Sequence, residues 1–189
     1  MIKYYNFWLQ KEIEPQVLYN FFTNNFDVSP IRLRMISKRT GVIEADAELA
    51  FDLHSILPVL SSDIGSGIVF VISPLDNDIG HRAVLKARKL GAGIYELADV
   101  ILLLLIDGDF SLVNALKAQL HNVDHELIDT ADMFIRCGLN ASLAAKKLYV
   151  HRNTFNYRLG NFINLTGLDI RDYANAQYYK LIRLLQLTK

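Results

Sequence analysis

Six side chains that could recognise another molecule lie close together between residues 152 and 158. They are Arg152, Asn153, Thr154, Asn156, Tyr157 and Arg158. An arginine can donate two hydrogen bonds to the edge of guanine, an asparagine can pair with adenine, and hydroxyl groups and cations can reach phosphate groups. The stretch contains no carboxylate that would repel a phosphate. Its residue types indicate recognition of a nucleic acid rather than catalysis.

The apolar residues within and after this stretch predict an α-helix. They recur at positions 0, 4, 7 and 8, which is the spacing of one helical stripe. The stripe consists of Phe155, Leu159, Phe162 and Ile163. Tyr157 lies opposite the stripe, and Arg152 lies in the first turn, where a long side chain can reach past the helix end. Gly160 costs about 1 kcal/mol relative to alanine in a helix interior, which indicates a close approach by another backbone or by DNA.

A second helix is expected just before it. Asn140 can cap that helix with its side-chain oxygen, and the alanines at 144–145 provide a face small enough for another helix to cross closely. Leu148 points inward at its end, and the chain breaks at residues 149–150. Two helices joined by a tight turn form the outline of a helix-turn-helix.

This region resembles the C-terminal helix-turn-helix of the PucR/CdaR class of bacterial transcriptional regulators. The sequence VHRNTFNYRL is preceded by AAKKL and followed by LTGLDIRD, and the similarity covers the chain downstream of Leu120. The matching positions are Leu148, Val150, His151, Arg152, Asn153, Thr154, Tyr157, Arg158, Leu159, Leu165, Thr166 and Gly167. More distantly, the same stretch is similar to the Fis-type DNA-binding helix pair.

The resemblance implies that the start of the second helix enters the major groove of DNA. Arg152 would then contact guanine, and either Asn153 or Asn156 would pair with adenine. Thr154 would contact a phosphate or a thymine methyl group. His151 would cap the second helix or bond a phosphate, and a metal-binding role is not expected for it.

The remaining candidate residues would bind the DNA backbone. Ser142, Tyr157 and Arg158 would reach phosphate groups, and Lys146 and Lys147 would add attraction that does not depend on sequence. The full set of candidate DNA-binding residues is Ser142, Lys146, Lys147, His151, Arg152, Asn153, Thr154, Asn156, Tyr157 and Arg158.

Other pairs of chemical groups have simpler explanations. His121 and His125 have the spacing of two metal ligands on a helix, but no third ligand is evident nearby. Residues 107–109 read Asp-Gly-Asp, which could hold a cation but more commonly forms a turn. Residues 65–67 read Gly-Ser-Gly but precede a strand, whereas a phosphate-binding glycine loop must follow one. We therefore expect no catalytic residue, no metal site and no cofactor.

The charge distribution agrees with a nucleic-acid partner for the C-terminal part. The chain has a formal net charge of zero, 51% hydrophobic residues and 21% charged residues, as in a folded globular protein. From residue 126 onwards there are nine Lys and Arg against five Asp and Glu, a net charge of +4. The preceding part has 11 against 15 and a net charge of −4.

The sequence also predicts a cytoplasmic protein that does not enter the membrane. The longest apolar run, Val100–Ile106, is much shorter than the roughly 20 residues needed to span a bilayer. Residues 1–10 lack the features of a signal peptide. The single cysteine, Cys137, excludes an internal disulfide and a zinc cluster built from cysteines.

The N-terminal part predicts a small α+β domain whose sheet is antiparallel or mixed. We expect strands at 31–35, 68–73 and 94–95, and a strand or the start of a helix at 42–46. Helices are expected at 12–26, 51–60 with a break at Pro58, 79–90, 97–106 and 111–120. The helix at 97–106 is rich in leucine and poor in β-branched residues, so we expect it to be buried. The segment AVLKARKLGAGIYELADVILLLLIDGD resembles the last helix, strand and helix of the degenerate GGDEF-like domain that often precedes this helix-turn-helix. No GGDEF signature is present, so nucleotide cyclase activity is not expected.

These observations predict two domains and one function. Residues 1–120 would form an α+β domain for sensing or dimerisation, and residues 121–189 an all-α helix-turn-helix domain with further helices at 126–136 and 171–187.

The whole chain would be a sequence-specific DNA-binding transcriptional regulator and not an enzyme. It would bind double-stranded DNA as a homodimer and respond to a small-molecule effector. The last helix and the N-terminal domain are both candidate dimer surfaces. Two rivals are an adaptor protein that keeps the fold without binding DNA, and an enzyme built on the N-terminal domain.

Overall fold

The protein consists of two compact units, which we describe separately. The structure, a computed structural model, describes residues 1–25 and 31–188. The first unit comprises Met1–Leu112 and the second Val113–Lys189. The first contains a sheet with helices and the second is helical, so the expected α+β fold class is confirmed. Within the described ranges, no helix is both long enough and apolar enough to cross a membrane.

The first unit is built on a five-stranded sheet with the order β2-β3-β1-β4-β5. All neighbouring strands are antiparallel except β4 and β5, so the sheet is mixed. The strands are β1 (Ile2–Leu9), β2 (Arg32–Met35), β3 (Thr40–Asp46), β4 (Ile68–Ser73) and β5 (Gly93–Glu96). The helices are α1 (Pro15–Asn25), α2 (Leu49–Asp63), α3 (Asp78–Ala87), the 3-10 turn η1 (Arg88–Leu90) and α4 (Leu97–Ile106). The first four strands with α1 and α2 form the split β-α-β arrangement of ferredoxin-like domains.

Most of the expected elements of this unit are confirmed, including the strand alternative for residues 42–46 and the bounds of α4. Two expectations were incomplete or wrong. The central strand β1 was not anticipated. Helix α2 also does not break at Pro58, because both Pro58 and His54 are exposed and water can reach the carbonyl group that loses its hydrogen bond. Residue 26, the expected end of the first helix, lies outside the described residues.

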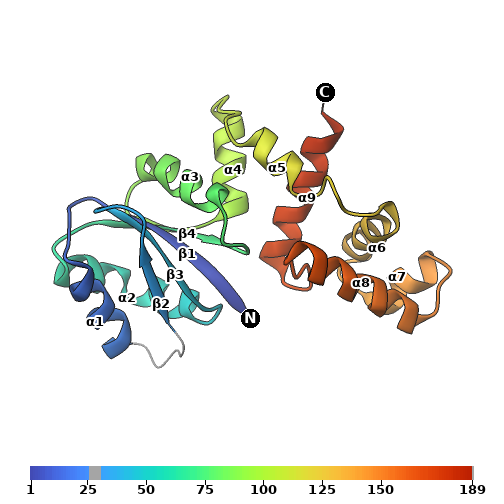
Figure 1. The fold of residues 1–189 in the computed structure, drawn as a ribbon, viewed down its shortest axis with the longest axis horizontal. Coiled ribbons are helices and arrows are strands. Elements are labelled where there is room, and N and C mark those ends of the chain that lie inside the picture. The colour runs from blue at the N-terminus through green and yellow to red at the C-terminus, as the bar shows by residue number, and fades with distance from the viewer. Residues whose placement is uncertain (26–30, 189) are drawn as a thin grey trace. The chain divides into compact units, whose positions relative to one another are not determined.

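Helices cover both faces of the sheet (Figure 1). Alternate residues of β1, among them Tyr5 and Phe7, are buried in one core with side chains of α1 and α2. On the other face, α3 contacts β1 and β4. It lies so close that a Cβ on Gly80 would be 2.5 Å from Asn6 Nδ2 and 2.9 Å from Ser73 Oγ. A larger residue there would displace the buried Asn6 and Ser73 side chains, so the close crossing of α3 over the sheet favours glycine.

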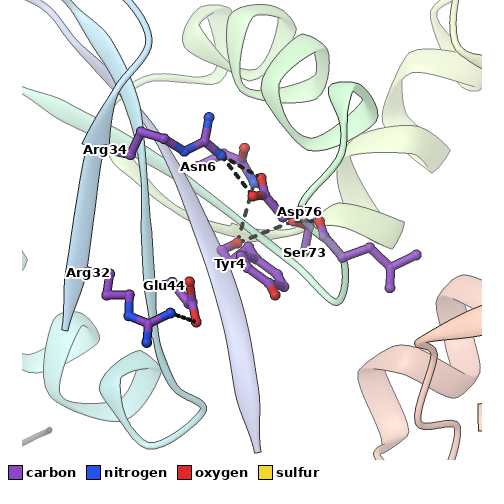
Figure 2. A network of polar contacts seen from close by, with 8 residues as sticks. Tyr4, Asn6, Arg32, Arg34, Glu44, Ser73 and Asp76 are labelled. Atoms are coloured by element: carbon purple, nitrogen blue, oxygen red, sulfur yellow. Dashed lines mark hydrogen bonds and ion pairs between the residues drawn. The ribbon is translucent and has the colours of Figure 1, made fainter. Parts of the chain in front are cut away.

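The half of this face near β2 carries a network of paired charges (Figure 2). Arg34 Nη2 donates to both carboxylate oxygens of Asp76 at 2.8 Å, and Arg32 Nη1 lies 3.4 Å from Glu44 Oε1. Burial raises the pKa of the Tyr4 hydroxyl, and the charges of Glu44 and Asp76 raise it further. The ion pairs connect β2 to β3 and to the loop after β4, and because their side chains are largely exposed they contribute little stability.

The second unit contains five helices within the described residues, and three of them form a small bundle. The helices are α5 (Val113–Ala118), α6 (His125–Arg136), α7 (Ala141–Lys147), α8 (Arg152–Thr166) and α9 (Tyr173–Leu187). Helices α6, α7 and α8 pack on one another, and α9 contacts α5 and α6. The ring centroids of Phe134 and Phe155 are 5.9 Å apart, and those of Phe162 and Tyr179 are 5.4 Å apart. These rings form the core that fixes α8.

A partly buried polar cluster ties α9 to α6. The Tyr179 hydroxyl lies 2.8 Å from Asp132 Oδ1, and Arg183 Nη2 donates to Asp132 Oδ2 at 3.1 Å. Burial raises the pKa of Tyr179 well above its ordinary value, and the hydrogen bond with Asp132 raises it further. The tyrosine therefore stays protonated and donates to the carboxylate.

Candidate nucleic-acid interface

The start of α7 is fixed by a capping residue that the sequence indicated. Asn140 has extended backbone angles, and its side-chain oxygen accepts a hydrogen bond from the Leu143 amide at 2.9 Å. Ala144 and Ala145 are buried, so the small face of α7 lies against the neighbouring helices as expected. Ser142 and Leu143 point outward on the other side.

The turn between α7 and α8 holds a tyrosine in a left-handed conformation. Tyr149 has a φ of 55° and its side chain is 97% exposed. The Val150 amide donates to the Ala145 carbonyl at 3.1 Å, and the Tyr149 amide donates to Lys146 at 3.2 Å. This pair of hydrogen bonds is the Schellman motif, in which the left-handed position is usually glycine. The sequence did not reveal this conformation, because a tyrosine gives no signal for it.

His151 begins α8 as a capping residue. Its Nδ1 accepts a hydrogen bond from the Asn153 amide at 3.2 Å, which confirms the capping alternative. Because Nδ1 is the acceptor, the neutral ring carries its proton on Nε2. That N–H remains a donor for a phosphate, so the second role stays a prediction.

Nine of the ten predicted DNA-binding residues are exposed, and the tenth is half-buried. The exposed ones are Ser142, Lys146, Lys147, His151, Arg152, Asn153, Thr154, Asn156 and Tyr157. In the described part of the chain, the cations Arg152, Lys146 and Lys147 have no ion-pair partner. The structure therefore brings together on α7 and α8 the donors and cations that the sequence singled out.

Arg158, the half-buried residue, has a partner that the sequence did not predict. Its Nη2 lies 2.6 Å from Glu126 Oε1 on α6, and its side chain is 24% exposed. Thirty-two positions separate the two residues along the chain, so helical periodicity alone could not show that they meet. In this arrangement Arg158 points to a carboxylate of its own domain, and its expected phosphate contact stays a prediction.

Gly160 lies in an open depression on the surface of α8. Apart from its chain neighbours and the backbone of its own helical turns, no described atom lies within 4 Å of the position that a Cβ would occupy there. The depression has a volume of about 590 Å³ and is bordered by Leu139, Asn156, Ile163 and other side chains. The expected close approach by another backbone of this chain is therefore wrong within the described residues, and an approach by DNA is untested.

The other candidates for chemistry do not form a site. His121 and His125 are both exposed. No three His, Cys, Asp or Glu side chains come together as metal ligands in residues 1–25 and 31–188. Asp107 and Asp109 instead form ion pairs with Lys89 and Lys86, at 2.8 Å and 2.7 Å.

Helices α7 and α8, with their caps, tight turn and polar outer face, define the second unit as a helix-turn-helix domain. Residues 127–185 match the family described as the PucR C-terminal helix-turn-helix domain. The second unit is therefore a PucR-type helix-turn-helix domain, the kind that this class of transcriptional regulators carries at its C-terminus.

Similar proteins include two from Bacillus subtilis (strain 168). The uncharacterized protein YxkF is 43% identical over 53 residues, which cover 28% of this chain and 18% of YxkF. The proline-responsive transcriptional activator PutR is 29% identical over 72 residues, which cover 38% of this chain and 18% of PutR. The chain thus matches less than a fifth of the length of these relatives.

A solved structure is similar over a longer part of the chain. It is the crystal structure of a regulator of polyketide synthase expression from Bifidobacterium adolescentis. The superposition has a TM-score of 0.49 and 14% sequence identity, and covers 98% of this chain and 80% of that one.

Proposed function

We propose that this chain is a sequence-specific DNA-binding transcriptional regulator that binds its operator as a homodimer. The observation that carries the proposal is the outer face of α7 and α8 in a PucR-type domain, where exposed donors lie together with cations that have no ion-pair partner among the described residues. A helix-turn-helix places the first residues of its second helix in the major groove. In this chain these residues are Arg152, Asn153 and Asn156.

In this proposal the domain makes two kinds of contact with DNA, to the edges of bases and to phosphate groups. Arg152 and the two asparagines read base edges, because their paired donors and acceptors match guanine and adenine. Ser142, Tyr157 and His151 bind phosphate groups and set the register of the domain on the duplex. Lys146 and Lys147 attract any DNA. Thr154 contacts either a phosphate or a thymine methyl group, and Arg158 reaches phosphate when it leaves Glu126.

The first unit supplies regulation in this proposal. The relative PutR is named as a proline-responsive activator, which supports a small-molecule effector for this chain as well. A helix-turn-helix of this size reads one half-site, so two copies are needed for a strong and specific complex. A regulator of this kind acts in the cytoplasm, and that location belongs to the proposal.

Selection of bound sequences from random duplex DNA, followed by titration of binding with salt, tests the proposal. The wild-type protein should enrich a roughly two-fold symmetric sequence. Arg152→Ala should weaken binding to that sequence by about 1 to 3 kcal/mol and relax the preference at one position of each half-site. Lys147→Ala should weaken binding to all sequences alike.

Lys180→Ala is the matched control, since Lys180 is an exposed cation on α9 outside the predicted contact set. It should change neither the preference nor the salt dependence appreciably. If the wild-type protein enriches no sequence and binds every duplex equally, the specific regulator is excluded. A folded protein that binds no DNA would favour the adaptor alternative.

A further inference from the structure

The outward face of α4 is apolar although no described segment of the first unit covers it. Three large side chains lie along it at helical spacing, with exposed fractions of 50% for Leu102, 41% for Leu103 and 73% for Ile106. Phe110, four residues beyond the helix end, is 65% exposed. We call these four residues the α4 stripe. Exposed apolar side chains grouped in this way mark interaction surfaces in soluble proteins.

The opposite face of α4 is already occupied. Leu97, Val100, Ile101 and Leu104 are buried, and the helix contacts α3, β4 and β5 in the first unit, beside α3 in Figure 1. A helix that is apolar all round is normally buried on all sides. The sheet accounts for one side of α4 and leaves the α4 stripe for a partner.

The charges beside the α4 stripe are almost all neutralised within the unit. Lys86 Nζ lies 2.7 Å from Asp109 Oδ2, and Lys89 Nζ lies 2.8 Å from Asp107 Oδ2. The hydrogen bond from Lys86 holds the pKa of Asp109 well below its ordinary value, so that pair keeps both charges near neutral pH. A fifth charged side chain, Asp99 in the first turn of α4, has no ion-pair partner among the described residues.

We propose that the α4 stripe is the surface through which two copies of this chain pair, with α4 against α4 in antiparallel, two-fold symmetric contact. The inference rests on the proposed function, which requires two copies. A two-fold contact must be self-complementary. Asp99 lies in the first turn of α4. At the other end of the helix, Lys89 donates a hydrogen bond to Asp107, the residue that follows the last residue of α4. The antiparallel arrangement therefore brings the Asp99 carboxylate of each copy toward the Lys89–Asp107 pair of the other, where the Lys89 ammonium group can bind both carboxylates.

The rival surface on α9 is less suited to a second copy. A groove of about 220 Å³ between α6 and α9 is lined by Ile135, Leu184 and Leu187. Its lining also includes Arg136 and Lys180, which are exposed and have no ion-pair partner within residues 1–25 and 31–188. Two-fold pairing there would bring like charges together, which opposes association. Charge thus favours the α4 stripe over the α9 groove.

Sedimentation velocity of the full chain without DNA, over a range of concentrations, tests the interface. The wild-type protein should sediment as a dimer. Ile106→Glu should raise the dissociation constant about 100-fold or more, because at each end of the contact a carboxylate would be buried against an apolar surface and close to Asp99 of the other copy. Leu184→Glu, with a parent side chain that is 52% exposed in the α9 groove, is the matched control and should remain dimeric. Circular dichroism and thermal unfolding would show that both variants are folded.

A charge variant tests the orientation. Asp99→Lys should weaken the dimer about 10-fold at low salt and much less at high salt, where charges are screened. An unchanged dissociation constant for Asp99→Lys would overturn the antiparallel arrangement.

A wild-type protein that stays monomeric, or a dimer that Leu184→Glu dissociates and Ile106→Glu does not, would overturn the interface. Binding of the monomeric Ile106→Glu variant to a single half-site would show that the proposed function holds independently. A dimer without sequence preference would keep the interface and exclude the proposed function.

Discussion

Helices α4 and α8 expose faces of opposite character. Each buries one apolar stripe, but α8 presents asparagines, arginine and Tyr157 to the outside, whereas α4 presents Leu102 and Ile106. Hydrogen-bond donors and cations match phosphates and base edges, and apolar side chains match another apolar surface. The solvent-facing half of a helix thus indicates the chemistry of its partner, while the buried half indicates only how the domain is built.

The largest effect is expected from truncating a side chain in the buried stripe of α8, because this stripe holds the polar outer face of the helix in place. Phe155 is fully buried and its ring contacts Phe134, so Phe155→Ala should destabilise the second unit by about 3 to 5 kcal/mol. Urea unfolding followed by circular dichroism would measure this. Leu165→Ala, at a position on the same helix that is 58% exposed, is the control and should cost about 0.5 kcal/mol or less. Equal effects of the two substitutions would contradict the division of α8 into buried and outward faces.

A smaller effect of opposite sign is expected at the turn before α8. Tyr149 occupies the left-handed position of a Schellman motif, and Gly138 occupies the same position after α6 with a φ of 64°. Tyr149→Gly should stabilise the domain by about 1 kcal/mol, because the strained backbone is relieved and an exposed ring loses few contacts. Thermal unfolding would measure the gain.

The matched variant is Gly138→Ala, which should destabilise by a similar amount because it introduces the same strain. If Tyr149→Gly instead lowers stability, the ring makes contacts that its exposure does not reveal. If it also weakens DNA binding, the exposed tyrosine contributes to the outward face of the helix-turn-helix.

The smallest effect is expected at the ion pair that ties α8 to α6. Glu126→Gln removes the carboxylate beside Arg158 and leaves the guanidinium group available to phosphate. The stability should change by less than about 1 kcal/mol, since Glu126 is largely exposed. Since Arg158 reaches phosphate only after it leaves Glu126, the variant should bind duplex DNA more tightly, by less than about 1 kcal/mol, in an affinity titration at low salt. Unchanged or weaker binding would mean that Arg158 does not bind phosphate.

The second unit was predictable because its signals are local. Asn140 caps the helix that begins at the next residue, Gly138 and Gly167 end helices at their own positions, and the stripe of α8 repeats within a few turns. The Glu126–Arg158 pair escaped prediction, since it joins two helices that are distant in sequence. Whether the predicted DNA-binding residues contact DNA stays a prediction, although their exposure agrees with it.

The first unit shows the limits of local reasoning more clearly. The bounds of α4 followed from its leucine-rich sequence, but that sequence alone suggested a buried helix and did not reveal the outward face. The strand β1 was missed because its two partners, residues 40–46 and 68–73, lie far along the chain. Aromatic and β-branched residues such as Tyr4, Tyr5 and Phe7 do favour a strand, and this signal could have been used.

The position of β1 in the middle of the sheet also affects the order of folding. During synthesis this strand leaves the ribosome before both of its partner strands, and it gains its β4 partner only after residue 73 has been made. Until then its aromatic side chains remain exposed and its backbone groups have a partner on one side at most. Helices α6, α7 and α8, by contrast, are consecutive in sequence and can assemble as they appear. The sheet is therefore the slower part of the molecule to form and the part more exposed to aggregation during synthesis.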